Sequence, residues 1–344
     1  MAKKNILSLQ VDPDLFQKAS DEEKAQFTTQ RESISFFKDA MRNFRKNKIA
    51  MICLVVIVVL TLIAIIVPFV YPYSYDDTDV TAKYLKPMQY SANELKRIAA
   101  GESVFPHIMG TDNLGRDYCI RVVYGMRISL AVGVFASLIV VVIGIIYGSI
   151  SGFFGGTVDM VMMRIVDIIY SLPDVLIIIL LSVAIKDTIN SSKSEIVQKI
   201  GPGMISIFIV FGLLYWVGMA RQVRGQILSI KEQEYVLAAK SFGSPASKII
   251  KIHMIPNCLS VIIITAALQI PSAIFTESFL SFLGLGVSIP MPSLGSLASD
   301  ARVGLQSYPY MLFYPALAIF LIVLSFNLLG NGLRDAFDPK LRSK

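Results

Sequence analysis

The chain has 344 residues, of which 54% are hydrophobic and only 17% are charged, and its mean hydropathy is +0.61. A soluble domain carries about 25% charged residues, so this composition excludes an ordinary soluble protein, a disordered chain and a disulfide scaffold. The net charge of +7 is better explained by basic residues that flank membrane spans than by nucleic-acid binding. The composition therefore indicates an integral membrane protein.

Six apolar stretches are long enough to cross a bilayer, which takes about 20 residues. They are residues 49–75 (with the helix itself over 49–71), 128–158, 165–185, 200–220, 254–276 and 303–333. If the N-terminus lies in the cytoplasm, segments 1–48, 151–165, 221–257 and 331–344 are cytoplasmic and hold 21 of the 32 Lys and Arg residues. The bias predicts an all-α polytopic fold with six transmembrane helices and both termini inside the cell.

The segments outside the spans differ in character. Residues 1–32 are polar and predict a disordered tail, whereas the apolar periodicity of 33–48 fits either an amphipathic interfacial helix or a simple extension of the first span. Residues 72–127 form an extracytoplasmic region, and 278–299, rich in Gly, Pro and Ser, read as a re-entrant piece or an outer loop. A five-helix core over 128–335 follows the external region, and 336–344 form a cytoplasmic tail.

The loop 221–257 is too long for a mere connection, and its pattern is regular. A helix is expected from Glu234, with Tyr235, Ala238, Ala239 and Phe242 on one face. Gly243 suits the left-handed position after a helix end, and Ser244 suits the N-cap of a second helix that ends at Pro256. Such a compact hairpin either docks into a groove of a partner protein or lies at the membrane interface without a partner.

At these residues the sequence resembles a known family. The run from Glu234 to Pro256 is similar to the EAA loop of permease subunits of ATP-binding cassette (ABC) importers, with Ala238, Ala239 and Gly243 in matching positions. Four more segments resemble the oligopeptide, dipeptide and nickel branch of this family, and within it the "C" subunit. They are residues 110–117, 221–226, 278–286 and 326–339.

The resemblance implies a type I importer fold and a set of partners. The chain would form a peptide pathway with a homologous second permease in the cell membrane, and two ATPase subunits using ATP and Mg²⁺ would bind the 221–257 loop. An extracytoplasmic binding protein would deliver the peptide. The chain itself would be no enzyme and bind no cofactor, because no Gly-Lys dipeptide, and so no P-loop, occurs in it. The alternatives are a nickel or nickel-chelate permease of the same family and an ion-coupled secondary transporter.

Two further groups of residues are candidates. Arg164 and Asp167 stand three apart and can pair on one helix face, while Asp174 follows Pro173 and lies deeper in the third span. These residues mark a polar patch in the pathway, or an interfacial pair beside a kink.

The second group lies in the external segment Gly110–Asp117. It contains Gly110, Asp112, Gly115, Arg116 and Asp117. This pattern fits either a contact with an external partner or a tight turn that needs none.

Overall fold

The computed structural model describes residues 36–190, 197, 201–286 and 291–337, and the chain divides into two compact units, residues 1–43 and 44–344. The predicted tail 1–32 and most of 336–344 lie outside the described residues, as do the side chain of Asp174 and part of 278–299. Helix α2 (Phe36–Lys46) crosses the boundary between the units. It has an acidic residue in its first turn and two basic residues in its last.

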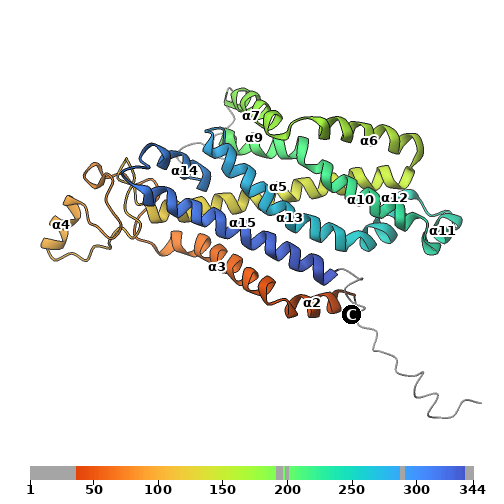
Figure 1. The fold of residues 1–344 in the computed structure, drawn as a ribbon, viewed down its shortest axis with the longest axis horizontal. Coiled ribbons are helices and arrows are strands. Elements are labelled where there is room, and N and C mark those ends of the chain that lie inside the picture. Colours follow the sequence, from red (N-terminus) through yellow and green to blue (C-terminus); the bar gives the residue numbers. More distant parts are fainter. Residues whose placement is uncertain (1–35, 191–196, 198–200, 287–290, 338–344) are drawn as a thin grey trace, which may run out of the picture. The chain divides into compact units, whose positions relative to one another are not determined.

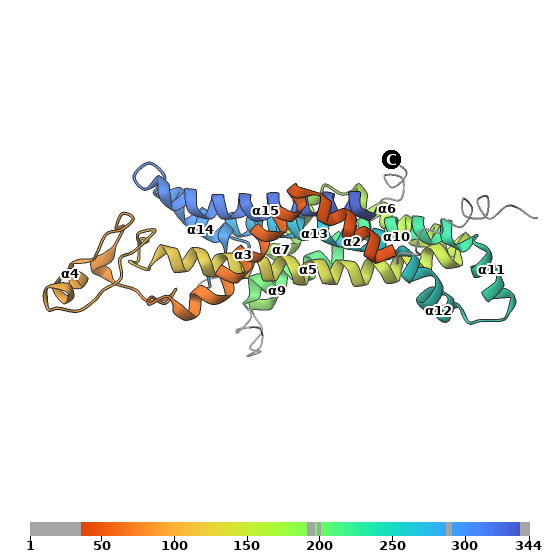
Figure 2. The same ribbon diagram turned by 90° about the horizontal axis from the view of Figure 1, so that it is seen from below.

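The second unit is a bundle of long helices (Figures 1 and 2). Its helices are α3 (Lys48–Val70), α4 (Ala92–Ala99), α5 (Tyr118–Phe154), α6 (Gly156–Ser171), α7 (Asp174–Asn190), α9 (Pro202–Val210), α10 (Trp216–Lys231), α11 (Glu234–Ser241), α12 (Ala246–Lys248), α13 (Ile255–Phe282), α14 (Leu294–Val303) and α15 (Pro309–Phe337). A short 3₁₀ turn covers Val80–Ala82, and π-helical turns cover Phe211–Tyr215 and Ile249–Met254.

Five of the described helices or continuous helical runs are long and apolar enough to cross a membrane, and α6 with α7 is a sixth if the pair is one broken span. The axes of this pair differ by 92°. Pro173 lies in the break and cannot continue the hydrogen-bond ladder of α6. The kink anticipated at this proline is therefore present.

The helix boundaries extend beyond the apolar runs. α5 begins at Tyr118, inside the segment expected to be external, because Arg121 and Arg127 interrupt the apolar run of the sequence without interrupting the helix. Arg121 is buried beside Asp112, which offsets its charge. Likewise α10 runs on to Lys231, so the first part of the 221–257 loop belongs to a span. Ser278–Phe282 complete α13, and the last long helix begins at Pro309 rather than at 303.

α5 is the central helix, in contact with α3, α10, α13 and α15. Gly144, Gly148 and Gly152 recur every fourth residue along it, and each approaches α10 so closely that a Cβ atom would meet α10 atoms. Small residues at this spacing let two helix backbones approach within a membrane. This stripe, not singled out as a packing motif by the sequence reading, brings α10 into the core.

Candidate functional site

The connection between α10 and α13 forms a hairpin at one end of the bundle, with α11 at its tip (Figures 1 and 2). We call residues 232–254 the α11 hairpin. Gly243, at φ +74°, ends α11 in a Schellman motif: its N–H donates to Lys240 O (2.9 Å), and Ser244 N–H donates to Ala239 O (3.1 Å). The predicted glycine turn is present, and it fixes the direction in which the chain leaves α11.

The α11 hairpin presents an apolar face that the chain itself does not cover. Val236 is fully buried against the bundle, and Ala239 packs beside it, which anchors the helix. Tyr235 and Phe242 face away, with 44% and 88% of their surfaces exposed. Of the residues predicted to share one face, Ala239 therefore packs inward, and Tyr235, Ala238 and Phe242 lie outside.

The second arm of the hairpin differs from the expected separate helix. The N-cap of α12 is Pro245 and not Ser244, and no side chain caps it. The chain then continues through the π-helical turn into α13, where Ile255 N–H donates to Ile250 O, five residues back. Pro256 has no N–H to donate, so the wider π-helical ladder lets it stand at the start of α13 without ending the helix. The prediction that Pro256 ends the arm is wrong.

Two ion pairs tie the base of the α11 hairpin to α6. Arg224 donates from Nε and Nη2 to the two oxygens of Asp159, both at 2.5 Å, in a bidentate pair. Arg221 Nη2 lies 2.6 Å from Asp167 Oδ1, and its guanidinium stands over the Tyr170 ring. Both arginines belong to α10, so the two ion pairs connect α10 with α6.

The ion pair of Asp167 corrects an expectation, since its partner is Arg221 of α10 and not Arg164 of its own helix. An arginine on the same helix competes for a carboxylate with any cation that tertiary packing brings closer. Here that cation is Arg221 of α10. Asp174 begins α7, and its side chain lies outside the described part of the chain. A pathway role for Arg164, Asp167 and Asp174 therefore stays a prediction.

The external segment Gly110–Asp117 folds into a tight turn centred on Asp112. The Asp112 carboxylate accepts from Leu114 N (2.8 Å), Arg116 N (3.0 Å) and Arg116 Nε (2.7 Å), and also from Arg121 Nη1. Gly110 and Gly115 have φ of +77° and +74°, which side-chain-bearing residues rarely adopt. The turn therefore gives these residues a structural role, and a contact with an external partner stays a prediction.

Asp117 closes the turn and caps α5 by accepting from Ile120 N (2.9 Å). Its other oxygen lies 2.7 Å from Nδ1 of the buried His107, whose Nε2 is 3.3 Å from Glu94 Oε1. Tyr73 stacks on the His107 ring and donates to Glu94 (2.7 Å). Burial raises the pKa of Tyr73 most, and this hydrogen bond raises it further, so the phenol keeps its proton. His107 thus joins α4 to the start of α5.

Replacing His107 by Phe should loosen the external region. The ring could still stack on Tyr73, but the carboxylates of Glu94 and Asp117 would lose the buried imidazole that joins them, at a cost of about 2 kcal/mol. We expect limited proteolysis to cut residues 71–117 at least tenfold faster. His253→Phe, at the only other histidine of the chain, is the matched control and should leave that rate unchanged. Equal rates for wild type and His107→Phe would contradict the role given to His107.

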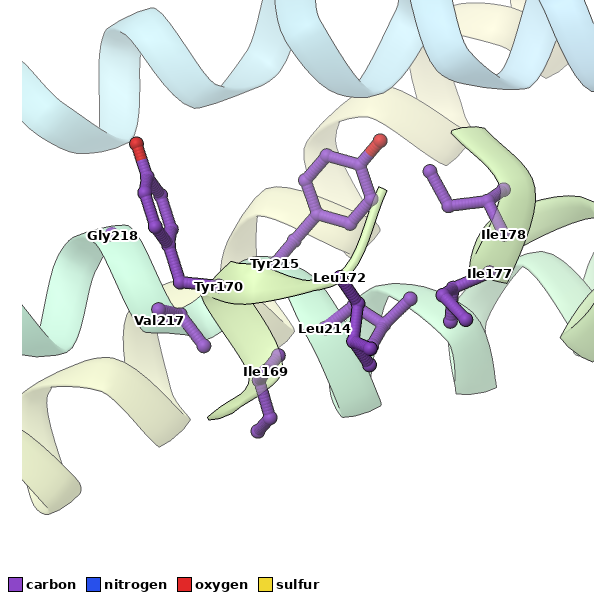
Figure 3. Close-up of a pocket in the computed structure, with 9 residues that line it drawn as sticks. All are labelled: Ile169, Tyr170, Leu172, Ile177, Ile178, Leu214, Tyr215, Val217 and Gly218. Atoms are coloured by element: carbon purple, nitrogen blue, oxygen red, sulfur yellow. The ribbon is translucent and has the colours of Figure 1, made fainter. Parts of the chain in front are cut away.

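Two of the cavities in the described part of the chain adjoin α10. The smaller, about 160 Å³, sits at the break between α6 and α7, and Figure 3 shows the hydroxyls of Tyr170 and Tyr215 pointing to the same side of it. The larger, about 700 Å³, lies between α10 and α13, and we call it the polar cavity. Its polar lining consists of Arg221, Gln222, Gln226, Thr265, Gln269, Ser272 and Arg334. Gly218 lines both cavities.

Glu277, which was not predicted from the sequence as a site residue, is fully buried near the end of α13. Its carboxylate accepts from the hydroxyls of Ser129 and Ser281, both at 2.7 Å, and Ser278 lies 3.3 Å away. An acidic residue at the edge of an apolar run, between Thr276 and Ser278, was the available signal. Among the described residues, no group of three or more His, Cys, Asp or Glu side chains is placed to hold a metal ion.

Comparison with known proteins supplies relatives over nearly the whole chain. The family described as "binding-protein-dependent transport system inner membrane component" matches residues 141–343, and "N-terminal TM domain of oligopeptide transport permease C" matches residues 35–87. The oligopeptide transport system permease protein OppC of Bacillus subtilis is 42% identical over 91% of this chain and 92% of its own length. The dipeptide permease protein DppC of the same organism is 43% identical (92% and 89%), and OppC of Escherichia coli is 39% identical (90% and 93%).

Proposed function

Because the chain belongs to the family of binding-protein-dependent transport system inner membrane components, we propose that it is a permease subunit of an ATP-driven importer of oligopeptides or dipeptides. The five or six spans make it a multi-pass inner-membrane protein. Relatives named for oligopeptides and dipeptides, both similar to this chain along most of its length, support peptides over nickel as the cargo.

In this proposal, other chains hydrolyse the ATP that drives transport. The sequence contains no P-loop, so two separate ATPase subunits hydrolyse ATP, and a second permease completes the pathway. An extracytoplasmic binding protein delivers the peptide. The family's dependence on a binding protein supports this arrangement over an ion-coupled transporter.

The observation that carries the proposal is the α11 hairpin. An exposed phenylalanine beside a fixed glycine turn, backed by a fully buried valine, makes a rigid apolar knob suited to a groove on an ATPase. Arg221 and Arg224 connect the helix that leads into the knob with α6. When ATP binding moves the ATPases, the knob shifts α10 and α6 together, and the bundle changes between discrete packed arrangements.

The test is Gly243→Val against Gly243→Asn. No atom lies within 4 Å of a Cβ at this position, so any effect comes from the backbone and not from a clash. A β-branched residue at φ +74° costs about 2 kcal/mol, whereas Asn tolerates the left-handed region. We expect Gly243→Val to lose co-purifying ATPase and peptide uptake at least tenfold and Gly243→Asn to keep most of both. Full ATPase retention and uptake in Gly243→Val would defeat the proposal.

A further inference from the structure

Polar side chains form a stripe along one face of α13, in the interior of a membrane-spanning helix. Thr265, Gln269 and Ser272 stand at i, i+4 and i+7, and all three line the polar cavity. Thr276 continues the same spacing, and its Oγ1 lies 3.0 Å from the hydroxyl of Tyr215, which lines the smaller cavity. The stripe therefore runs over about half the length of the helix.

α10 supplies a second polar wall to the cavity. Gln222 and Gln226 stand one turn apart, and Thr265 Oγ1 donates to Gln222 Oε1 at 2.5 Å across the two helices. Gln269 is different, because its buried Nε2 has no hydrogen-bond partner among the described residues. A buried amide donor without a partner costs about 1–3 kcal/mol, so the Gln269 amide gains a hydrogen bond if its side chain turns toward a substrate or water in the cavity it lines.

A stripe of amides and hydroxyls does not belong against lipid, where nothing bonds to it. We propose that the polar cavity is this subunit's part of the peptide path, and that Gln222, Gln226, Thr265, Gln269 and Ser272 bind the peptide main chain. This inference rests on the proposed function and adds to it the wall of the pathway and the part of the substrate that the wall contacts.

The chemistry of the wall fits a main chain and not a particular side chain. A glutamine amide both donates and accepts, and so matches a peptide N–H or C=O in any sequence. The described residues that line the cavity include Arg221 and Arg334 but no acidic residue, so no carboxylate holds a basic peptide in place. Neutral hydrogen bonds contribute only about 1 kcal/mol each, which lets a substrate leave as well as enter.

The rival occupant of this face is the second permease, packed so that the cavity is closed. The accessibility of single cysteines in the complete transporter distinguishes a peptide path from a face packed against the second permease. In a chain whose three native cysteines, Cys53, Cys119 and Cys258, are replaced by Ala, we would introduce Gln269→Cys or Ser272→Cys. A water-soluble thiol reagent is then applied with and without ATP. Phe275→Cys is the matched control. Phe275 also belongs to α13 and is 61% exposed, but it does not line the polar cavity.

We expect the reagent to modify positions 269 and 272 in at least one nucleotide state, and transported peptide to slow that modification at least fivefold. Position 275 should react slowly in every state. No modification at 269 and 272 in any state would show a face packed against protein, and modification without peptide protection would show water but no path. Either result would overturn the assignment of the polar cavity to the peptide path. The proposed function would still hold as long as the wild-type complex takes up peptide. A wild-type complex that carries no peptide overturns both.

The main-chain assignment has its own test in Gln269→Leu and Gln269→Asn. With three peptides of equal length but positive, negative and zero side-chain charge, all carried by the wild type, we expect Gln269→Leu to lower uptake of each at least tenfold. Gln269→Asn keeps the amide and should lower uptake by no more than threefold. A loss confined to one side-chain charge, or equal losses for Leu and Asn with ATPase retention unchanged, would overturn main-chain binding.

Discussion

Phe242→Ala should abolish most peptide uptake while the protein still folds. Phe242 is 88% exposed, so its removal leaves no cavity in the chain. Aromatic anchors at the centre of an interface contribute about 2 kcal/mol or more to binding, which corresponds to about thirtyfold in affinity. We therefore expect at least a tenfold loss both of co-purifying ATPase and of uptake by reconstituted vesicles.

Phe69→Ala is the control for this variant. Phe69 is 78% exposed, but it lies near the end of α3 that leads to the external region, away from α11 (Figure 1). The thermal stability of both variants should match the wild type, and ATPase retention should fall only for Phe242→Ala. If the ATPase stays bound to Phe242→Ala at wild-type affinity, the knob is not the docking element and the interfacial alternative is correct.

Gly148→Ala should strongly destabilise the bundle. An added Cβ would stand 3.0 Å from Val223 Cβ and 3.1 Å from Arg224 N, and closer still to the carbonyl oxygen of Ala220. Because that oxygen and Arg224 N belong to the backbone of α10, the clash is relieved only if the two helices move apart. Such overpacking costs about 1–3 kcal/mol. It would also displace Arg224 from Asp159.

Gly218→Ala is the same substitution on α10, at a position where no atom lies within 4 Å of the added carbon. We expect a lower midpoint of thermal unfolding in detergent for Gly148→Ala and an unchanged midpoint for Gly218→Ala. Equal midpoints for Gly148→Ala and the wild type would mean that the approach of α5 to α10 is not tight.

The local features of the molecule were predictable because neighbouring residues decide them. A run of apolar residues requires a span in any context, and a glycine after a helical run sets the turn at Gly243. The EAA-like pattern added the expectation of a docking loop. By contrast, the prediction that a helix ends at Pro256 was wrong. The π-helical turn before Pro256 changes the hydrogen-bond pattern, so the helix continues although this proline has no N–H to donate.

The amino-acid sequence by itself determined the membrane class, the apolar segments and the glycine turn of the α11 hairpin, since each depends on a few consecutive residues. Only the tertiary structure decided that Asp167 pairs with Arg221, that Glu277 is buried among serines and that the stripe of α13 faces α10. These contacts join residues far apart in the chain, 65 positions in the case of Arg224 and Asp159. The glycine stripe of α5 lets α10 approach closely. Which side chains then meet depends on how several helices pack together, and no single segment encodes that.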